Sequence, residues 1–514
     1  MRDLLIGVDS STSATKAVVF DRSGKTITMA SQGYDISNPN PGWSEQDPED
    51  WRKAFIGVCR KVMSHPDVSP DRIASIGITH QRFSFVPVDS DMRALRPAIL
   101  WNDIRCGEEA EFARRKIGAD RVFLRTGYAP GQWTLYKALW LKNNEPKVYD
   151  RTFKLMLVQD LLIHFLTDEL VTLAGAATMT GALDIERPDR WAEDIIDELG
   201  VRRDIWIDKI LPGCVQAGTV SRQAAEATLL PEGLPVITTA GDQPCGILGA
   251  GVTQPGQLGI NGGTSCTNEF VVSALPSRTS QDFMIEVSPG GEYVVENYIP
   301  SGGSALMNWY RNNFGAADEL QAEKAGLEIW TEIYDLAGQC PPGNNGVCLL
   351  PFFQGANGPF WDLDARGILF GLHTDHGRPE IVRAIMEGLA YESRRQADLM
   401  VQATGTDVSV IRMYGGSAAS DHWNQIFSDV LGVPVEIPDA AETTALGAAI
   451  SAAVGVGMYE TCKEACSQMV SVKKSYTPTT AYKELYDRYF NDVYEPLYRQ
   501  NMNLMARSAA ISKR

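Results

Sequence analysis

The chain has 514 residues, more than one typical hydrophobic core accommodates, so we expect two to four domains. Apolar residues make up 44% and charged residues 22% of the chain, which argues against a disordered or fibrous protein. The net charge of −17 argues against a nucleic-acid-binding surface, so an anionic ligand would need local positive groups and a metal ion.

The N-terminus and the cysteines both favour a cytoplasmic protein. The first residues lead directly into an apolar segment instead of building a secretory signal, and no run of about 18 apolar residues predicts a membrane span. The nine cysteines are scattered without a CxxC pair, which favours reduced thiols. Cys462 and Cys466 have no companion ligands, so we favour buried thiols over a zinc site.

The first predicted element is a hairpin. Residues 4–9 are typical of a buried strand and residues 16–21 of a second strand, joined by the small polar turn 10–15. The turn is not a Walker loop, which needs a Gly-rich sequence ending in GK[ST] before a helix.

A later strand ends in polar side chains. Residues 72–79 are predicted to form this strand, and Gln81 and Arg82 follow it. Residues 85–89 are expected to pair with it. Since open α/β sheets bind ligands at strand ends, Gln81 and Arg82 are candidates for binding hydroxyl groups.

The segment 97–105 is another apolar run with a polar end, at Asn102, Asp103 and Arg105. These side chains are also candidates for hydroxyl binding at a strand end. The alternative is a structural ion-pair set formed by Arg82, Asp103 and Arg105. The residues themselves leave both interpretations open.

One carboxylate near the middle of the chain follows a short apolar strand, residues 234–237. Residues 238–243 read TTAGDQ, and the proline and glycines after them suit a tight turn into a closely packed helix. We interpret Asp242 as a catalytic base. The alternative is that Asp242 only caps the helix, since Asp is a favoured N-cap residue.

The N-terminal hairpin recurs in the second half. Residues 259–267 align with residues 7–15, with Gly, Thr, Ser and Thr identical. We expect two related halves whose hairpins face each other across a cleft and cradle phosphate oxygens. Only the first copy keeps a carboxylate, so Asp9 would hold Mg²⁺ while Asn261 adds no second charge. The alternative is two ordinary tight hairpins, because Ser, Thr and Gly are common in turns.

A turn of small residues, 415–420, separates a predicted strand, 408–414, from a predicted helix, 421–431. Its adjacent glycines let backbone approach a flat ligand and the helix amides favour a polar edge, which suits an adenosine. The alternative is simple strand-to-helix packing. The small-residue helix 442–450 is expected to pack closely against this turn, and the tail 481–505 is predicted to form a long amphipathic helix.

Two signatures resemble the FGGY family of carbohydrate kinases. Residues 367–372 and 380–387 fit the C-terminal signature of that family, while Gln132 and Ala138 depart from the N-terminal one. The resemblance covers nearly the whole chain. It implies an α/β, actin-like fold with two duplicated, ribonuclease-H-like domains and a nucleotide and sugar cleft between them. The N-terminal signature agrees at Thr134, Lys137, Trp140, Leu141, Asn143 and Asn144.

The resemblance also implies roles for single residues. Asp9 would meet the metal and Asp242 would be the base. Ser11 stands where the family usually has Gly, so we expect this loop to approach the phosphate less closely. The implied nucleotide- and phosphate-binding residues are Ser11, Thr12, Ser13, Gly263, Thr264, Ser265, Gly415, Gly416, Ser417 and Asn424.

The substrate signals conflict. The segment 97–106 is similar to xylulose kinases, but residues 81–82 replace the Met-His pair of those enzymes. The segment 78–82 is similar to glycerol kinases, but Phe83 replaces a glutamate that binds polyol hydroxyls, and Gln132 replaces a tyrosine. A pocket that loses such an acceptor cannot be assumed to keep the same ligand.

We therefore predict ATP-dependent phosphorylation of a terminal hydroxyl of a small sugar, with Mg²⁺ near Asp9. A pentulose such as xylulose is favoured over a polyol such as glycerol or a tetritol. The alternative from another class is a non-catalytic actin-like ATPase. Substrate-binding candidates are Gln81, Arg82, Asn102, Asp103, Asp242 and Gln243.

ATP and a small sugar or polyol are the expected partners, without nucleic acid or membrane, and a homodimer is one alternative for the oligomeric state. Residues 1–250 are expected to form an N-terminal actin-like domain with the sugar site and the first phosphate loop. Residues 251–475 would form a second actin-like domain that binds nucleotide, and residues 476–514 a C-terminal helix packing back on the domain interface.

Overall fold

The computed structural model describes residues 2–276 and 281–512 of the chain, so the last two residues of the predicted range 476–514 lie outside it. Two compact units are present. They are built from interleaved segments, whereas the predicted domains are contiguous ranges. The first unit consists of Met1–Gln254, Val272–Val294 and Ala440–Ser471, and the second of Pro255–Val271, Val295–Asp439 and Val472–Arg514.

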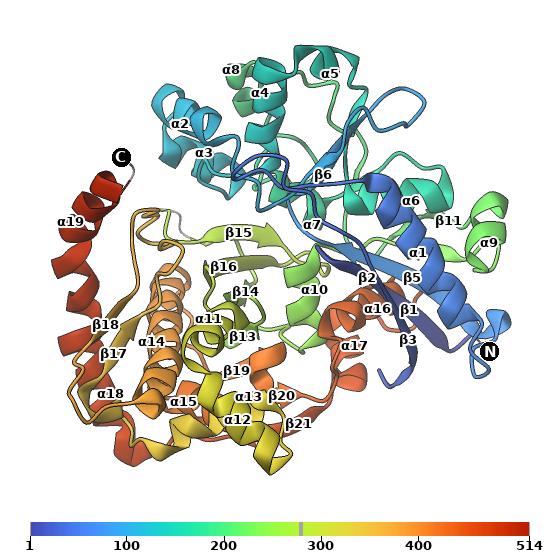
Figure 1. Cartoon of the computed structure of the whole chain (residues 1–514). Helices are drawn as coiled ribbons and strands as arrows, with labels where there is room; N and C mark the ends of the chain where they lie inside the picture. The colour runs from blue at the N-terminus through green and yellow to red at the C-terminus, as the bar shows by residue number, and fades with distance from the viewer. Residues whose placement is uncertain (1, 277–280, 513–514) are drawn as a thin grey trace. The chain divides into compact units, whose positions relative to one another are not determined.

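The first unit is an α/β unit (Figure 1). Its strands are β1 (Leu4–Ser10), β2 (Ala14–Asp21), β3 (Thr26–Gly33), β4 (Glu45–Gln46), β5 (Ile73–His80), β6 (Phe85–Val88), β7 (Ala98–Ile99), β8 (Lys154–Leu157), β9 (Thr172–Leu173), β10 (Ile210–Leu211), β11 (Gln216–Thr219), β12 (Pro235–Ile237) and β15 (Met284–Val287). Its α-helices are α1 (Pro48–Met63), α2 (Gly107–Lys116), α3 (Ala119–Thr126), α4 (Thr134–Asn144), α5 (Pro146–Arg151), α6 (Val158–Thr167), α7 (Ala174–Ala177), α8 (Glu193–Leu199), α9 (Arg222–Thr228), α10 (Asp242–Gly249), α16 (Thr443–Gly455) and α17 (Cys462–Met469).

The second unit also mixes strands and helices. Its strands are β13 (Gln257–Gly262), β14 (Cys266–Val272), β16 (Tyr293–Ile299), β17 (Cys348–Leu350), β18 (Ile368–Phe370), β19 (Val410–Tyr414), β20 (Val435–Pro438) and β21 (Val472–Tyr476). Its α-helices are α11 (Ser304–Phe314), α12 (Ala316–Ala325), α13 (Ile329–Leu336), α14 (Arg378–Thr404), α15 (Asp421–Leu431), α18 (Lys483–Arg488) and α19 (Glu495–Ser512).

The two units contain the same sheet topology. In the first, the strand order is β3-β2-β1-β5-β12-β11. The other large sheet has seven strands, and the six that belong to the second unit have the order β16-β14-β13-β19-β20-β21. Each has an antiparallel hairpin, β1–β2 or β13–β14, whose first strand pairs in parallel with β5 or β19. A further parallel strand and a final antiparallel strand follow in both. The predicted repeat is thus a duplication of a whole sheet.

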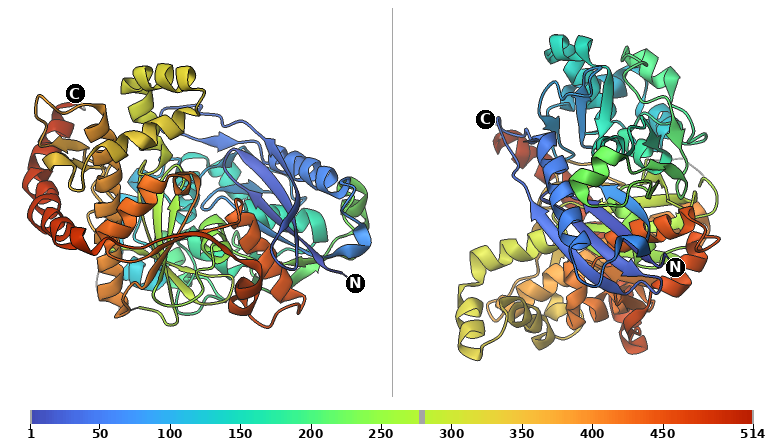
Figure 2. Two further views of the ribbon diagram at one scale, coloured as in Figure 1. Left: turned by 90° about the horizontal axis from the view of Figure 1, so that it is seen from below. Right: turned by 90° about the vertical axis from the view of Figure 1, so that its right-hand side faces the viewer.

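Helices α1 and α16 both pack against the first sheet. Helix α1 contacts β2 and β3, and it runs alongside the blue strands in both views of Figure 2. Its N-terminus is capped by Asp47, which accepts a hydrogen bond from the backbone N–H of Glu49, as expected for a favoured N-cap residue. Helix α16 contacts β1, β5 and α10.

The place of α16 corrects one prediction. We expected the helix at 442–450 to pack against the small-residue turn at 415–420, but it belongs to the first unit. The reason is close packing: a Cβ at Gly7 would lie 1.9 Å from the carbonyl oxygen of Ala445, and one at Gly77 would lie 2.3 Å from that of Ala448. The strands and the helix therefore meet backbone to backbone.

The predicted strand at 85–89 forms, but it does not pair with the strand before it. Strand β6 pairs with β7 and β8 in a separate sheet of order β4-β7-β6-β8. Phe83 between β5 and β6 has a φ of 60°, and this left-handed turn directs the chain out of the first sheet.

The predicted C-terminal helix is interrupted. Helices α18 and α19 are joined by a π-helical segment, Tyr489–Tyr494. Tyr498 of α19 donates a hydrogen bond to Asp362 at 2.7 Å, which ties the tail to the second unit. Among the described residues, no helix combines the length and the apolar character that crossing a bilayer would require.

Candidate functional site

The carboxylate predicted as base lies at the start of α10, directly after β12. Helix α10 is held against α16 by reciprocal glycine contacts. A Cβ at Gly249 would lie 1.8 Å from the carbonyl oxygen of Thr443, and one at Gly447 would lie 1.8 Å from that of Cys245. Since α16 also packs against β1, one small-residue helix positions both α10, which carries Asp242, and β1.

Asp242 is not the cap of this helix. The N-cap is Gly241, without a side-chain cap bond, and Asp242 is the first helical residue. Its carboxylate accepts a hydrogen bond from the backbone N–H of Gln243 at 2.9 Å and lies 3.2 Å from Nε of Arg82. Burial raises the pKa of Asp242, Arg82 opposes that rise and the charge of Glu286 adds to it. The side chain keeps 29% exposure, so a reactant can reach it.

Arg82 lies beside Asp242 because Gly241 leaves room for it. A Cβ on Gly241 would lie 2.8 Å from Cγ of Arg82. The guanidinium also donates through Nη1 to Glu286 at 2.5 Å, and the hydroxyl of Tyr128 donates to the same carboxylate oxygen. One guanidinium is thus shared between Asp242 and Glu286.

Asp9 of β1 is the predicted metal ligand, and its surroundings fit that role. One carboxylate oxygen, Oδ1, is buried and has no hydrogen-bond partner among the described residues. Lys16, opposite Asp9 in the hairpin, is paired with Glu442 at 2.8 Å. Burial raises the pKa of Asp9 to about 7, the charges of Asp242 and Glu442 add to the rise, and Lys16 opposes it.

No cluster of three or more His, Cys, Asp or Glu side chains able to hold a metal occurs in the described part of the chain. Mg²⁺ usually keeps several waters and binds through one or two carboxylates together with substrate phosphates. The buried Oδ1 atom of Asp9, which has no hydrogen-bond partner among the described residues, could serve as such a ligand, and this role stays a prediction.

The predicted first phosphate loop is well anchored. Both the backbone N–H and the hydroxyl of Ser11 donate to the carbonyl of Ala14 at 2.9 Å. The hydroxyl of Thr12 accepts from the indole of Trp101 at 2.9 Å, and its carbonyl accepts from Gln46 at 2.6 Å. Ser13 is exposed. The Ser11 donors are therefore engaged within the turn, and the loop presents Thr12 and Ser13.

Other predicted substrate-binding residues are engaged in structural contacts. Gln81 is buried, where its amide donates to Gln46 at 3.1 Å and accepts from Ser84 at 3.1 Å. Asp103 is buried and bonded to Arg105, with 2.6 Å between Oδ2 and Nη2, which is the ion-pair alternative. The pKa of Asp103 is lowered although burial, the largest influence, would raise it, because the hydrogen bonds from Arg105 and from backbone N–H groups together outweigh burial. Asn102 is exposed.

In the second unit, the turn after β13 is tied to the start of α11. The backbone N–H of Ser304 donates to the carbonyl of Gly263 at 2.7 Å, and that of Gly303 donates to Thr264 at 3.2 Å. The side chain of Thr264 is exposed and that of Ser265 is half-buried.

The small-residue turn lies against the same strand end. The hydroxyl of Ser417 donates to the carbonyl of Gly262 at 3.1 Å, and Gly415 has a φ of 84°. An added Cβ at Gly416 would lie 3.9 Å from that same carbonyl oxygen, which is an ordinary contact. Asn424 holds the turn by donating to the carbonyl of Ala418 at 2.9 Å. The predicted nucleotide residues of this unit are therefore neighbours, and their binding of nucleotide stays a prediction.

Two domain matches cover most of the chain. The N-terminal domain of the FGGY family of carbohydrate kinases matches residues 4–249, and the C-terminal domain of that family matches residues 258–456. The chain belongs to the FGGY family of carbohydrate kinases.

Full-length relatives agree with this assignment. The chain is 28% identical over 508 residues to a xylulose kinase from Bacillus subtilis (strain 168), covering 97% of each chain. It is 30% identical over 478 residues to a glycerol kinase from Aromatoleum aromaticum (strain DSM 19018 / LMG 30748 / EbN1), covering 90% of this chain and 92% of that one. A crystal structure of gluconate kinase from Lactobacillus acidophilus has a TM-score of 0.89 at 24% identity, covering 97% and 98% of the chains, and shows the same fold.

These findings confirm the predicted actin-like α/β fold and the predicted class, an ATP-dependent carbohydrate kinase. They set aside the alternative of a non-catalytic actin-like ATPase.

The N-terminal signature residues of this FGGY kinase hold the site segments in place. Thr134 donates to the carbonyl of Phe83 at 3.1 Å. The buried ammonium of Lys137 donates to the carbonyl of Leu100 at 2.5 Å and to that of Trp101 at 3.2 Å. Because the Trp101 indole donates a hydrogen bond to Thr12, Lys137 supports the loop at Thr12 indirectly.

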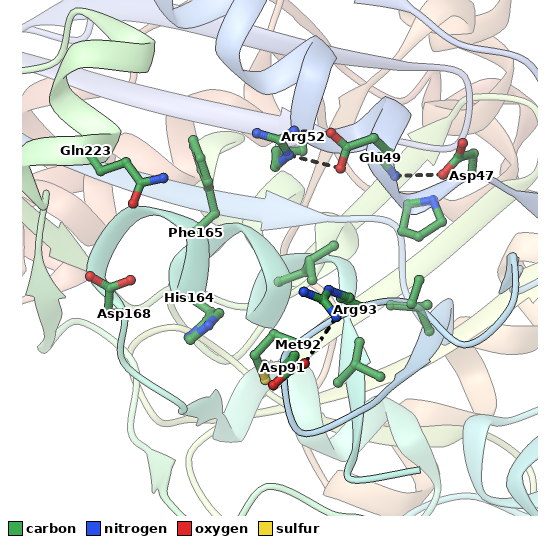
Figure 3. Close-up of a pocket in the computed structure, with 15 residues that line it drawn as sticks. Asp47, Glu49, Arg52, Asp91, Met92, Arg93, His164, Phe165, Asp168 and Gln223 are labelled. Atoms are coloured by element: carbon green, nitrogen blue, oxygen red, sulfur yellow. Dashed lines mark hydrogen bonds and ion pairs between the residues drawn. The ribbon is translucent and has the colours of Figure 1, made fainter. Parts of the chain in front are cut away.

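A large surface pocket of the first unit lies apart from these residues. Its volume is about 600 Å³, and its lining includes Arg52 and Arg93 but none of the predicted site residues (Figure 3). Arg52 is paired with Glu49, and Arg93 lies 3.1 Å from Asp91. Each of these two arginines of the pocket is thus paired with a carboxylate. A large volume alone does not identify this pocket as the active site of the FGGY kinase.

Sequence reasoning missed three groups that contact predicted site residues in the structure: Gln46, Trp101 and Glu286. The first two could not be separated from ordinary core residues by spacing. Glu286 carried a weak signal, since it is the one charged residue in the apolar strand β15.

Proposed function

We propose that this FGGY kinase transfers the γ-phosphoryl group of ATP to a terminal hydroxyl of a small neutral sugar, with a pentulose such as xylulose favoured. The observation that carries the proposal is the electrostatic interaction between two carboxylates, Asp242 and Asp9, to which we assign different roles. Asp242 is reachable and has a raised pKa, and its charge in turn raises the pKa of Asp9, so the two interact.

Asp242 would accept the proton of the acceptor hydroxyl and orient that hydroxyl for attack. A raised pKa suits this task, because a general base works best when its pKa approaches the operating pH. Arg82, 3.2 Å from Asp242, would hold the carboxylate in a single orientation and donate to a neighbouring hydroxyl.

Asp9 would hold Mg²⁺, which when bound neutralises charge on the transferred phosphoryl group. The orphaned Oδ1 supports this role. Thr12 and Ser13 in the first unit, and the turns at Gly263 and Gly415 in the second, would bind phosphates and nucleotide. In this proposal, these residues would hold the reactants in position for transfer.

The proposed substrate class is based on the relatives that the chain resembles. A xylulose kinase and a glycerol kinase match at similar identity, so a polyol is the second candidate, favoured by Arg82 at the end of β5. The exposed Asn102 and the half-buried Gln243 remain candidates for further hydroxyl contacts. A homodimer is one proposal for the assembly.

A coupled assay of ADP release tests the proposal. Purified protein with Mg²⁺ and ATP would be screened against xylulose, ribulose, glycerol, tetritols and pentitols. We expect at least one pentulose to stimulate ADP release strongly and Asp242→Asn to abolish that stimulation. Stimulation by glycerol alone would select the polyol alternative, and an Asp242→Asn variant with near wild-type rate would refute the base assignment.

A further inference from the structure

Cys214 and Cys462 form a close thiol pair within the first unit. Their sulfur atoms lie 3.4 Å apart, although 248 positions separate the two residues in the sequence. All nine cysteines lie in the described part of the chain, where eight are buried and Cys214 is half-buried. No described cluster of three or more His, Cys, Asp or Glu side chains able to hold a metal includes either thiol. The pair therefore suits chemistry between two thiols and not a metal centre.

A fixed turn holds the sulfur of Cys214 in place. Cys214 has a φ of 56°, in the left-handed region that few residues other than glycine adopt. A Cβ added to the preceding Gly213 would lie 2.1 Å from the carbonyl oxygen of Pro289, and the Cys214 thiol donates to that oxygen at 3.2 Å. Because this thiol donates to Pro289, Cys462 is the donor in the contact between the two sulfur atoms. The turn thus keeps the sulfur of Cys214 against the thiol of Cys462.

Cys462 is the first residue of α17, which packs against α16 and α10. On the same helix, the thiol of Cys466 donates to the carbonyl of Leu248 in α10 at 3.2 Å. The hydrogen bond with Cys214 and burial raise the pKa of the Cys462 thiol. Cys462 therefore stays protonated, and the more exposed Cys214 is the thiol that an oxidant in solution meets first.

We propose that Cys214 and Cys462 form a site of reversible oxidation, at which a peroxide converts the two thiols into a disulfide that clamps α17 to the turn at Cys214. Forming the bond requires the sulfur atoms to approach by about 1.4 Å, from 3.4 Å to about 2.0 Å. The inference is independent of the proposed function, because neither ATP nor sugar takes part in this reaction.

The reaction balances in two steps. Hydrogen peroxide first oxidises the sulfur of Cys214: the oxygen–oxygen bond breaks, a sulfur–oxygen bond forms, and water leaves behind a sulfenic acid. The sulfur of Cys462 then attacks that of Cys214 and displaces hydroxide, which takes up the proton of the Cys462 thiol and leaves as a second water. The two thiols lose two electrons and two protons, and one peroxide is reduced to two waters.

The disulfide would restrain both supports of the segment that leads into Asp242. The backbone N–H of Cys214 donates to the carbonyl of Thr238 at 3.0 Å, and the N–H of Thr238 donates to the carbonyl of Val215 at 2.8 Å. Thr238 directly follows β12, and α17 contacts the helix α10 that begins with Asp242. A crosslink between residues so far apart in the sequence also restricts the unfolded chain, which stabilises the folded state. We therefore expect the oxidised protein to melt at a higher temperature than the reduced protein.

The test treats the full-length protein with hydrogen peroxide, alkylates the remaining thiols and maps the tryptic peptides by mass spectrometry without reduction. Cleavage after Lys463 separates Cys462 from Cys466, so the two cysteines are distinguished. We expect one linked pair of peptides, which contains Cys214 and Cys462 and disappears with dithiothreitol. The oxidised protein should melt at least about 3 °C above the same sample after dithiothreitol, a reference that keeps any oxidised methionine.

Three variants control the experiment. Cys214→Ser and Cys462→Ser should each lose the linked peptides and the difference in Tm, whereas the matched control Cys466→Ser should keep both. Full alkylation of Cys214 and Cys462 after peroxide, a disulfide between Cys462 and Cys466, or a Cys214 oxidised only to sulfonic acid would overturn the proposal. A Cys214–Cys462 disulfide without a rise in Tm would overturn the clamp. The peptide map of the wild type decides even if a serine variant fails to fold.

Discussion

Helices α10 and α16 pack in close contact at Gly447, and the variant Gly447→Ala tests this contact. The added Cβ would lie 1.8 Å from the carbonyl oxygen of Cys245 and 2.7 Å from its carbon, where ordinary contacts begin near 3.4 Å. Both atoms are backbone, so no side chain can rotate away. The two helices must move apart by more than an ångström.

The magnitude follows from two opposing effects. Overpacking a closely packed contact costs about 1–3 kcal/mol, and a rigid backbone neighbour places this case at the upper end. Replacing a helical Gly by Ala returns about 1 kcal/mol through helix propensity. We expect a net loss of about 2 kcal/mol in the free energy of unfolding.

Activity should fall as well. Helix α10 carries Asp242, and a displacement of about 1 Å at a catalytic group can cost roughly 100-fold in rate. Urea unfolding followed by circular dichroism measures the stability, and ADP release measures kcat/KM. The matched control is Gly107→Ala at the start of α2, because a Cβ added to Gly107 would have no described neighbour within 4 Å. A Gly447→Ala protein with the stability and activity of the control would refute the backbone contact.

Four further predictions concern single carboxylates. Asp242→Asn should lower kcat by about 100- to 10,000-fold while the protein stays folded, as judged by ADP release and thermal melting, and an active variant would contradict the assigned base. Asp9→Asn should raise the Mg²⁺ concentration needed for half-maximal activity at least 10-fold, in a titration of ADP release with metal, and an unchanged curve would rule out Asp9 as the ligand. Burial raises the pKa of Asp160 to about 7, so the folded state binds the proton more tightly than the unfolded chain does. The free energy of unfolding should therefore fall by up to about 4 kcal/mol as the pH rises from about 4 to 7. Asp160→Asn should remove this loss in urea unfolding at pH 5 and pH 8, and a variant with the wild-type pH profile would show that the loss has another source. Asp103→Ala should cost about 3 kcal/mol in unfolding because it leaves the buried Arg105 with one fewer partner, whereas a stable variant with a raised acceptor KM would restore the sugar-binding interpretation.

The fold was predictable wherever local pattern and tertiary structure agree. The hairpin β1–β2 and its copy β13–β14 could be predicted, because two apolar strands around a Ser/Thr-rich turn form a pattern that is contained in a short stretch of sequence. The pairing of β6 was not visible, because the turn at Phe83 takes a left-handed conformation that no sequence rule assigns to a phenylalanine. The placement of α16 was not visible either, since a run of small residues indicates close packing without naming the partner.

Local pattern also determined which contacts of the candidate site could be predicted. Asp242 and Arg82 follow strand ends, where ligand sites of α/β sheets are expected, and the structure brings them into contact. Asp103 also follows a strand, and its carboxylate is bonded to Arg105, so its role toward a ligand stays a prediction. The position of a residue after a strand makes it a candidate for ligand binding. The hydrogen-bond partners of its carboxylate then distinguish a buried ion pair from a carboxylate that a ligand can reach.

Hydrogen bonds and ion pairs also determine the charge pattern around the predicted site residues. Asp9, Asp242, Glu286 and Glu442 are four carboxylates, and the cations bonded to them are Lys16 and Arg82. Lys16 is paired with Glu442, and Arg82 is paired with both Asp242 and Glu286. The Oδ1 atom of Asp9 and the Oε2 atom of Glu286 lack a hydrogen-bond partner among the described residues, and burial raises the pKa of Asp9 to about 7. A Mg²⁺ ion held by Asp9, as proposed, would favour the ionised carboxylate, so metal binding and the ionisation of Asp9 would favour each other.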